Sequence, residues 1–110
     1  MPTFIVIGYG DRNGYEKTTP SVKDMAHKHD TYLRDSGAVM GVVGTPIQVR
    51  NHDAAQVVTT EGPFQQSELP VAGFTVLEAA TIDEAVRLAS KTPCAVAQGV
   101  VEVWPLQLTA

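Results

Sequence analysis

The sequence predicts an α+β domain in which two helices pack on one face of a single sheet. Apolar runs rich in Val and Ile are bounded by polar turn residues, which is typical of strands. Two other segments repeat apolar residues at helical spacing along one side only. The elements follow the order β-α-β-β-β-α-β, and helices with one-sided apolar stripes bury those stripes against a sheet.

The first strand and the first helix have clear boundary signals. Residues 3–9 are a continuous apolar run, which predicts a central strand buried on both faces. The turn residues at 10–14 then predict a loop. Thr19 is placed as the cap of the first helix, with Pro20 in its first turn, and Gly37 marks its end.

One side of this helix carries the residues that we expect to face the sheet. They are Val22, Met25, Ala26, His29, Tyr32 and Leu33. His29 interrupts an otherwise apolar stripe, so its imidazole should point into the space between helix and sheet. His27 falls on the polar side and should be exposed to solvent.

The rest of the chain predicts three middle strands, one helix and a closing strand. The strands are expected at residues 38–43, 55–60 and 74–79, with a short strand piece at 47–50 and a turn at 51–53 that makes a hairpin. Thr81 and Glu84 form a capping box that starts the second helix, which Pro93 ends. Residues 99–105 close the sheet.

Composition predicts one soluble domain, residues 1–110, and excludes several classes of partner. The 110 residues are one domain's length, and 44% of them are hydrophobic. A net charge of −4 argues against nucleic acid and anionic membranes. Cys94, the single cysteine, cannot form an internal disulfide, and no apolar run reaches the ~20 residues of a membrane helix. We therefore expect a cytoplasmic location.

The second half of the chain carries a series of short motifs at fixed spacing. They are Glu61-Gly62-Pro63-Phe64, Ala72-Gly73-Phe74, the helix start Thr81-Ile82-Asp83-Glu84-Ala85, and Val101-Glu102-Val103-Trp104-Pro105. This series resembles the signature of the YCII-related proteins, in particular the branch named for its DGPF motif. That family usually reads Asp-Gly-Pro-Phe, Gly-Gly-Phe or Gly-Gly-Tyr, an Asp-Glu-Ala helix start and a closing Glu-Val-Arg-Pro.

The resemblance implies a ferredoxin-like single sheet with two helices on one face, which pairs with a second copy into a dimeric α+β barrel. The residue pattern alone also favours a homodimer. With both helices on one face, the other face would be left as an apolar patch larger than soluble monomers tolerate.

Three departures from the family pattern bear on function. Glu61 stands where the family has Asp, which lengthens the carboxylate arm by one methylene. The charged segment after the motif appears here as residues 65–69 without its lysine. Trp104 replaces an Arg, which removes a possible anion clamp and adds apolar surface.

The resemblance implies an acid–base pair, because YCII-related proteins typically carry a histidine in the first helix with an acidic partner. Imidazole exchanges protons near neutral pH, so His29 is the leading candidate for a base, oriented by Glu61 or Asp30. The helix reads His27-Lys28-His29, and either histidine can match the family's. His27, Tyr32, Phe64 and Phe74 are expected to contact a ligand. The alternative is that His29 is a core residue satisfied by one hydrogen bond and that Glu61 caps a loop.

These observations predict two functions of different classes. In the first, the protein is an enzyme that acts on a small molecule by cofactor-free acid–base chemistry, as a lyase, isomerase or dehalogenase. In the second, it is a non-catalytic dimer that binds a metabolite or a protein, with a possible link to sigma-factor regulation that the resemblance implies. No metal site is expected, because His27 and His29 on one helix point about 200° apart.

Overall fold

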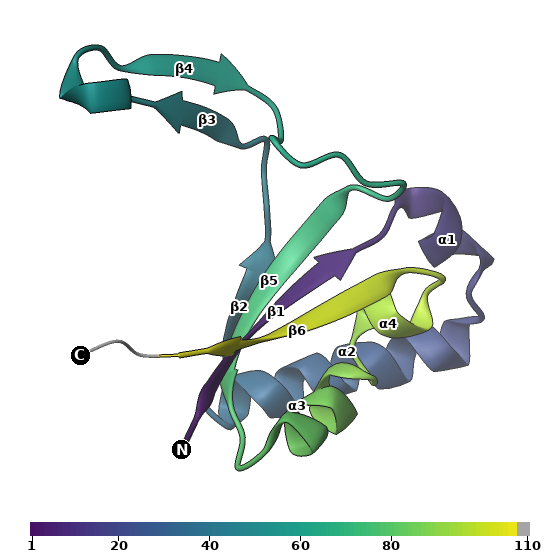
Figure 1. The fold of residues 1–110 in the computed structure, drawn as a ribbon. Helices are drawn as coiled ribbons and strands as arrows, with labels where there is room; N and C mark the ends of the chain where they lie inside the picture. Colours follow the sequence, from purple (N-terminus) through teal and green to yellow (C-terminus); the bar gives the residue numbers. More distant parts are fainter. Residues whose placement is uncertain (108–110) are drawn as a thin grey trace.

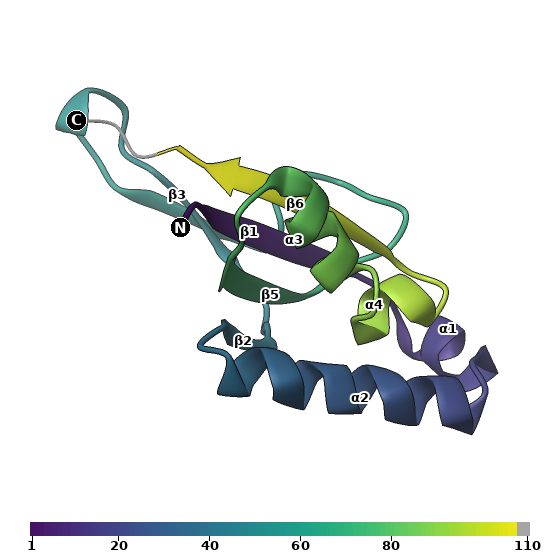
Figure 2. The ribbon, with the colours of Figure 1, turned by 90° about the horizontal axis from the view of Figure 1, so that it is seen from below.

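The computed structural model describes residues 1–107 and has an α+β fold, built on a four-stranded antiparallel sheet (Figure 1). The strands are β1 (Thr3–Tyr9), β2 (Val39–Val42), β5 (Val71–Glu78) and β6 (Val100–Leu106), in the order β2-β5-β1-β6. A helix follows β1 and another follows β5, which is the βαββαβ pattern of ferredoxin-like domains in outline. The helices α2, α3 and α4 lie on one side of the sheet (Figure 2).

The central position predicted for β1 is confirmed. It pairs with β5 on one side and with β6 on the other, placing Phe4 opposite Leu77 and Val6 opposite Val103. Phe4, Val6 and Leu77 are buried against Ala85 and other helix residues to form the core. The alternate residues of β1 are only half-buried, so burial on both faces, as predicted, is not found within this chain.

The main helices begin where the sequence predicted. The first, α2 (Pro20–Asp35), follows Thr19, and Gly37 beyond its end has a φ of +102°, a conformation that glycine adopts most readily. The second, α3 (Ile82–Ala89), is capped by the Thr81 hydroxyl, which accepts a hydrogen bond from the Glu84 amide at 3.1 Å. The Glu84 carboxylate reaches the amide of Ala80 instead of that of Thr81.

The apolar stripe predicted for α2 is only partly correct. Ala26 and Leu33 are buried, whereas Met25 and Tyr32 are 71% and 57% exposed. His29 of the predicted stripe is half-buried, and so is Asp30, which was not part of the stripe. The reason is that α2 packs beside α4, and His29 contacts the Leu88 carbonyl of α3, so burial along α2 does not follow the apolar stripe alone.

Two short helices lie where a loop and a helix end were predicted. Residues 12–14 belong to α1 (Arg12–Lys17), which is capped by Asp11 through a 2.9 Å hydrogen bond from the Gly14 amide to its Oδ1. Pro93 begins α4 (Pro93–Val96) instead of ending a helical region. Proline is compatible with the first turn of a helix because the amide hydrogen that it lacks would have no partner there.

A two-stranded hairpin projects from the body of the molecule (Figure 1). It consists of β3 (Ile47–Arg50) and β4 (Val58–Glu61), joined through the short 3-10 turn His52–Ala54. We call residues 47–61 the arm. The predicted hairpin of residues 47–50 and 55–60 is therefore confirmed in outline, but its strands form a separate sheet and do not join the single sheet that was predicted. The pairing of β2 with β5 ends near Val42, and the chain leaves the sheet there before the arm begins at Ile47.

The turn that carries the Glu61-Gly62-Pro63-Phe64 motif closes the arm at its base. The Gly62 amide donates to the Pro46 carbonyl at 2.9 Å, and the Gly62 φ of +107° falls in the region that favours glycine. Of the residues in this motif, Glu61 and Phe64 are exposed. Among the described residues, no helix is long and apolar enough to cross a membrane.

Candidate functional site

A cavity of about 150 Å³ lies between α2, α4 and the helix-facing side of the sheet. Its lining is largely apolar but includes Asp30 and Arg34 from α2 and Cys94 from α4, together with the buried threonines Thr75 and Thr92. A small apolar cavity with a few convergent polar groups is the usual form of a small-molecule site.

Asp30 is the most unusual residue of this cavity. Its Oδ1 atom is buried and has no hydrogen-bond partner, although polar atoms that are removed from water are normally paired. Burial disfavours the charged carboxylate and raises the pKa of Asp30. The positive charge of Arg34, one helical turn further on, acts in the opposite direction but does not cancel the effect of burial.

Cys94 lies in the same cavity and is half-buried. Burial raises the pKa of its thiol, and the negative charge of Asp30 raises it further, so the thiol is held protonated. The thiol sits against β1 at Gly8, where an added Cβ would approach the Cys94 Sγ to 2.9 Å. Gly8 therefore makes room for the sulfur.

His29 has a different position from the one predicted for a base. Its Nε2 lies 2.6 Å from the Leu88 carbonyl oxygen, which can only accept, so this nitrogen carries the proton. The ring stacks on Tyr32, with 5.9 Å between the centroids. His29 is not among the residues that line this cavity, nor does it line the groove between α3 and β6 that is described below. The geometry is that of a histidine satisfied by backbone, and its catalytic role stays a prediction without a contact to support it.

The structure separates most of the other predicted site residues. Asp30 and Phe74 are among the residues that line the cavity. His27 is exposed, as predicted, and its Nε2 lies 2.7 Å from the Tyr15 hydroxyl. Glu61 and Phe64 belong to the arm and its base and contribute nothing to the cavity lining.

Sequence reasoning missed Arg34 and Cys94 as neighbours of Asp30. Arg34 follows Asp30 by four residues, a spacing that places both on one helix face and could have indicated the pair. No sequence signal connects Cys94 to α2, because only the packing of α4 beside that helix brings them together.

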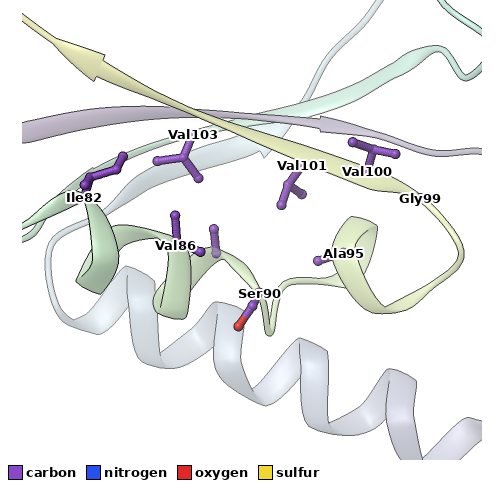
Figure 3. A pocket seen from close by; sticks show the side chains of 9 residues that line it. Ile82, Val86, Ser90, Ala95, Gly99, Val100, Val101 and Val103 are labelled. Atoms are coloured by element: carbon purple, nitrogen blue, oxygen red, sulfur yellow. The ribbon is translucent and has the colours of Figure 1, made fainter.

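A second hollow, a groove of about 570 Å³, lies between α3 and β6 (Figure 3). Val101 and Val103 point from β6 toward α3, where Ile82 and Val86 face them. Its lining contains no ionisable side chain. The groove can therefore hold apolar groups but offers no group for proton transfer, which is why the smaller cavity is the candidate site.

Neither the protein-family models nor the curated proteins yield a match to this chain. Among residues 1–107 there is also no group of three or more side chains suited to hold a metal ion. The cavity and its contacts are therefore the main basis for a functional assignment.

Proposed function

We propose that the chain is a small-molecule enzyme of the YCII-related type that uses cofactor-free acid–base chemistry, with Asp30 as the proton-transfer group. The observation that carries this proposal is the buried, unpartnered Oδ1 of Asp30, which lines a cavity of about 150 Å³. A carboxyl group whose pKa is raised can hold a proton closer to neutral pH than an ordinary Asp, which suits it to donate and accept protons.

The neighbouring groups support a division of roles. Arg34 supplies a positive charge that can stabilise an oxyanion on a bound ligand. The Cys94 thiol, held protonated, provides a soft and weakly polar wall. A hydroxylated or carbonyl compound with an acidic C–H bond matches these groups, and lyase, isomerase or dehalogenase chemistry begins with such a proton transfer.

The experiment measures exchange of protons between solvent and a panel of small enolisable carbonyl and hydroxylated ring compounds. In deuterium oxide, the wild-type chain should catalyse deuterium incorporation into at least one compound, followed by NMR. Asp30→Asn should lower that rate by about 10²–10⁴-fold, the usual contribution of a general acid–base group. Asp24→Asn, an exposed position on the same helix, is the matched control and should retain the wild-type rate. Equal exchange by both variants would exclude Asp30 as the proton-transfer group.

A second candidate function, a non-catalytic dimeric binding module, is favoured by the sheet face that points away from the helices. We call it the outer face. Half-buried Ile5 on β1 has Val76 and Trp104 as its cross-strand neighbours there, and Trp104 is 54% exposed. An open apolar face of this kind supports a homodimer formed through it.

One polar cluster on the outer face is compatible with such an interface. The Tyr9 hydroxyl donates to Glu102 Oε1 at 2.6 Å, and Trp104 Nε1 donates to the same oxygen at 3.4 Å. When a second subunit covers a carboxylate, the desolvation cost is smaller if the carboxylate already accepts hydrogen bonds than if it has no partner. The homodimer is compatible with either function, since the cavity lies on the opposite side of the sheet.

A further inference from the structure

The arm leaves the molecule on the side of the sheet that faces away from the helices (Figure 1). In that view the helices lie below the sheet and the arm lies above it, beyond the outer face. A body that packs on the outer face would therefore lie beside the arm. Among the described residues, the two arm strands form a sheet of their own and pair only with each other.

The arm has little to stabilise it within one chain. An isolated two-stranded hairpin is marginally stable in water, because it has no second layer to cover its side chains. Ile47 and Val49 share one face of the arm and are 57% and 65% exposed. The other face is occupied by contacts within the arm and its base, where Arg50 donates to Gln48 and lies over the ring of Phe64.

The arm also adds apolar surface on the side of the molecule to which the outer face points (Figure 1). Ile47 and Val49 of the arm add exposed apolar side chains to those of Val76 and Trp104 on the outer face. A stable interface usually buries about 800 Å² on each partner, and apolar surface from both the sheet and the arm contributes to that area.

We infer that the arm is an intersubunit clasp: in the homodimer, the Ile47 and Val49 face of each arm docks on the body of the second copy. This inference rests on the homodimer proposed above. A two-fold interface makes the contact reciprocal, so both arms dock at once. A second copy of this chain is the partner that fits. It carries its own open apolar face, which can cover the outer face of the first copy, and its own arm, which can dock in return.

The first test compares dimer dissociation constants by sedimentation. The double variant Ile47→Asp, Val49→Asp should weaken the wild-type dimer at least tenfold. Thr60→Asp, on the opposite face of the arm, is the control and should change the constant less than twofold. A wild-type dimer that the double variant leaves unchanged would overturn the clasp and leave sheet-to-sheet dimerisation standing. A wild-type monomer would overturn both.

The second test follows hydrogen exchange of the arm amides and needs no change in the arm itself. The amides of residues 47–61 should exchange at least tenfold more slowly in the wild-type dimer than in a monomeric Trp104→Asp variant. Equal protection in the two would mean that the arm is ordered within its own chain, and the clasp would be rejected. Neither measurement depends on the acid–base role of Asp30, so failure of that proposal is detected separately.

Discussion

At the scale of single residues, the contrast between Asp30 and its neighbour His29 carries the functional argument. Both are half-buried on α2, but His29 has a backbone partner and one Asp30 oxygen has none. A satisfied polar group contributes to stability, whereas an unsatisfied one costs about 1–3 kcal/mol. Because the unpartnered oxygen of Asp30 lies beside a cavity, it is available to form a hydrogen bond with a ligand.

Asp30 should make the stability of the protein depend on pH in an unusual direction. Its pKa is raised in the folded chain, so the folded state binds the proton more tightly than the unfolded state. Stability therefore falls as the pH rises from the ordinary Asp value of 3.8 through the folded value. Asp30→Asn should unfold at a higher urea concentration than wild type at pH 7, and the difference should shrink at pH 4.

Urea midpoints measured across this pH range for wild type, Asp30→Asn and the exposed control Asp24→Asn decide the matter. If the urea midpoints of wild type and Asp30→Asn change with pH in parallel, burial does not disfavour the charged form of Asp30.

Cys94 gives a second measure of the charge on Asp30. Because Cys94 is the single cysteine, an alkylating reagent reports on this thiol alone. Burial and the Asp30 charge raise the pKa of the thiol, so alkylation by iodoacetamide should be slow at pH 8. Asp30→Asn removes the negative charge and should shift the pH profile of alkylation toward lower pH. A profile that does not move would place the two groups too far apart to interact.

At the scale of elements, local sequence patterns were enough to predict where both main helices begin and where the first of them ends. The limits of α2 follow from Pro20 and Gly37, and the start of α3 follows from the hydroxyl of Thr81. Contacts between distant segments could not be predicted in this way. The partner of His29 is Leu88, 59 residues away, and helix periodicity does not specify which carbonyl an imidazole will meet.

The candidate site was accessible to sequence reasoning in part. The sequence indicates Asp30 and Phe74 as site residues, whereas for Cys94 it shows only that an internal disulfide is impossible. The hairpin of residues 47–50 and 55–60 was predicted, but its separation from the main sheet was not, because a strand pattern indicates extended backbone and not the sheet to which a strand belongs. Which strands pair depends on all the strands of a sheet together. In the main sheet, β2 pairs with β5, and β3 and β4 pair with each other in a separate sheet.

The contact of β1 with α4 should be sensitive to one added methyl group. Gly8→Ala would place a Cβ 2.9 Å from the Cys94 Sγ and should destabilise the fold by about 1–3 kcal/mol. Combining it with Cys94→Ala removes the sulfur and should recover part of that loss. Gly41→Ala in β2, whose added Cβ meets nothing within 4 Å, is the control for loss of a strand glycine. Denaturation of wild type, Gly8→Ala, Cys94→Ala and the double variant measures the coupling, and additive effects would contradict it.

At the scale of the whole molecule, the outer face should determine the oligomeric state. Trp104→Asp places a charge at an exposed apolar position of that face and should convert the homodimer into a monomer. Met25→Asp makes the same type of change on α2, on the helix side, and should leave the dimer intact. Light scattering coupled to size exclusion at micromolar concentration compares the two. Equal masses for the two variants would show that Trp104 lies outside any interface.

The position of β1 between β5 and β6 also has a consequence for how the chain acquires its structure during synthesis. Among the strands of this sheet, β1 leaves the ribosome first and pairs with β6, which leaves it last, since Thr3 lies opposite Leu106. Contacts between such distant segments form slowly, because a long loop must close before they are gained. Until β6 is released, β1 has an open edge in the middle of the future sheet, and the nascent chain is most prone to pair with other strands at that stage.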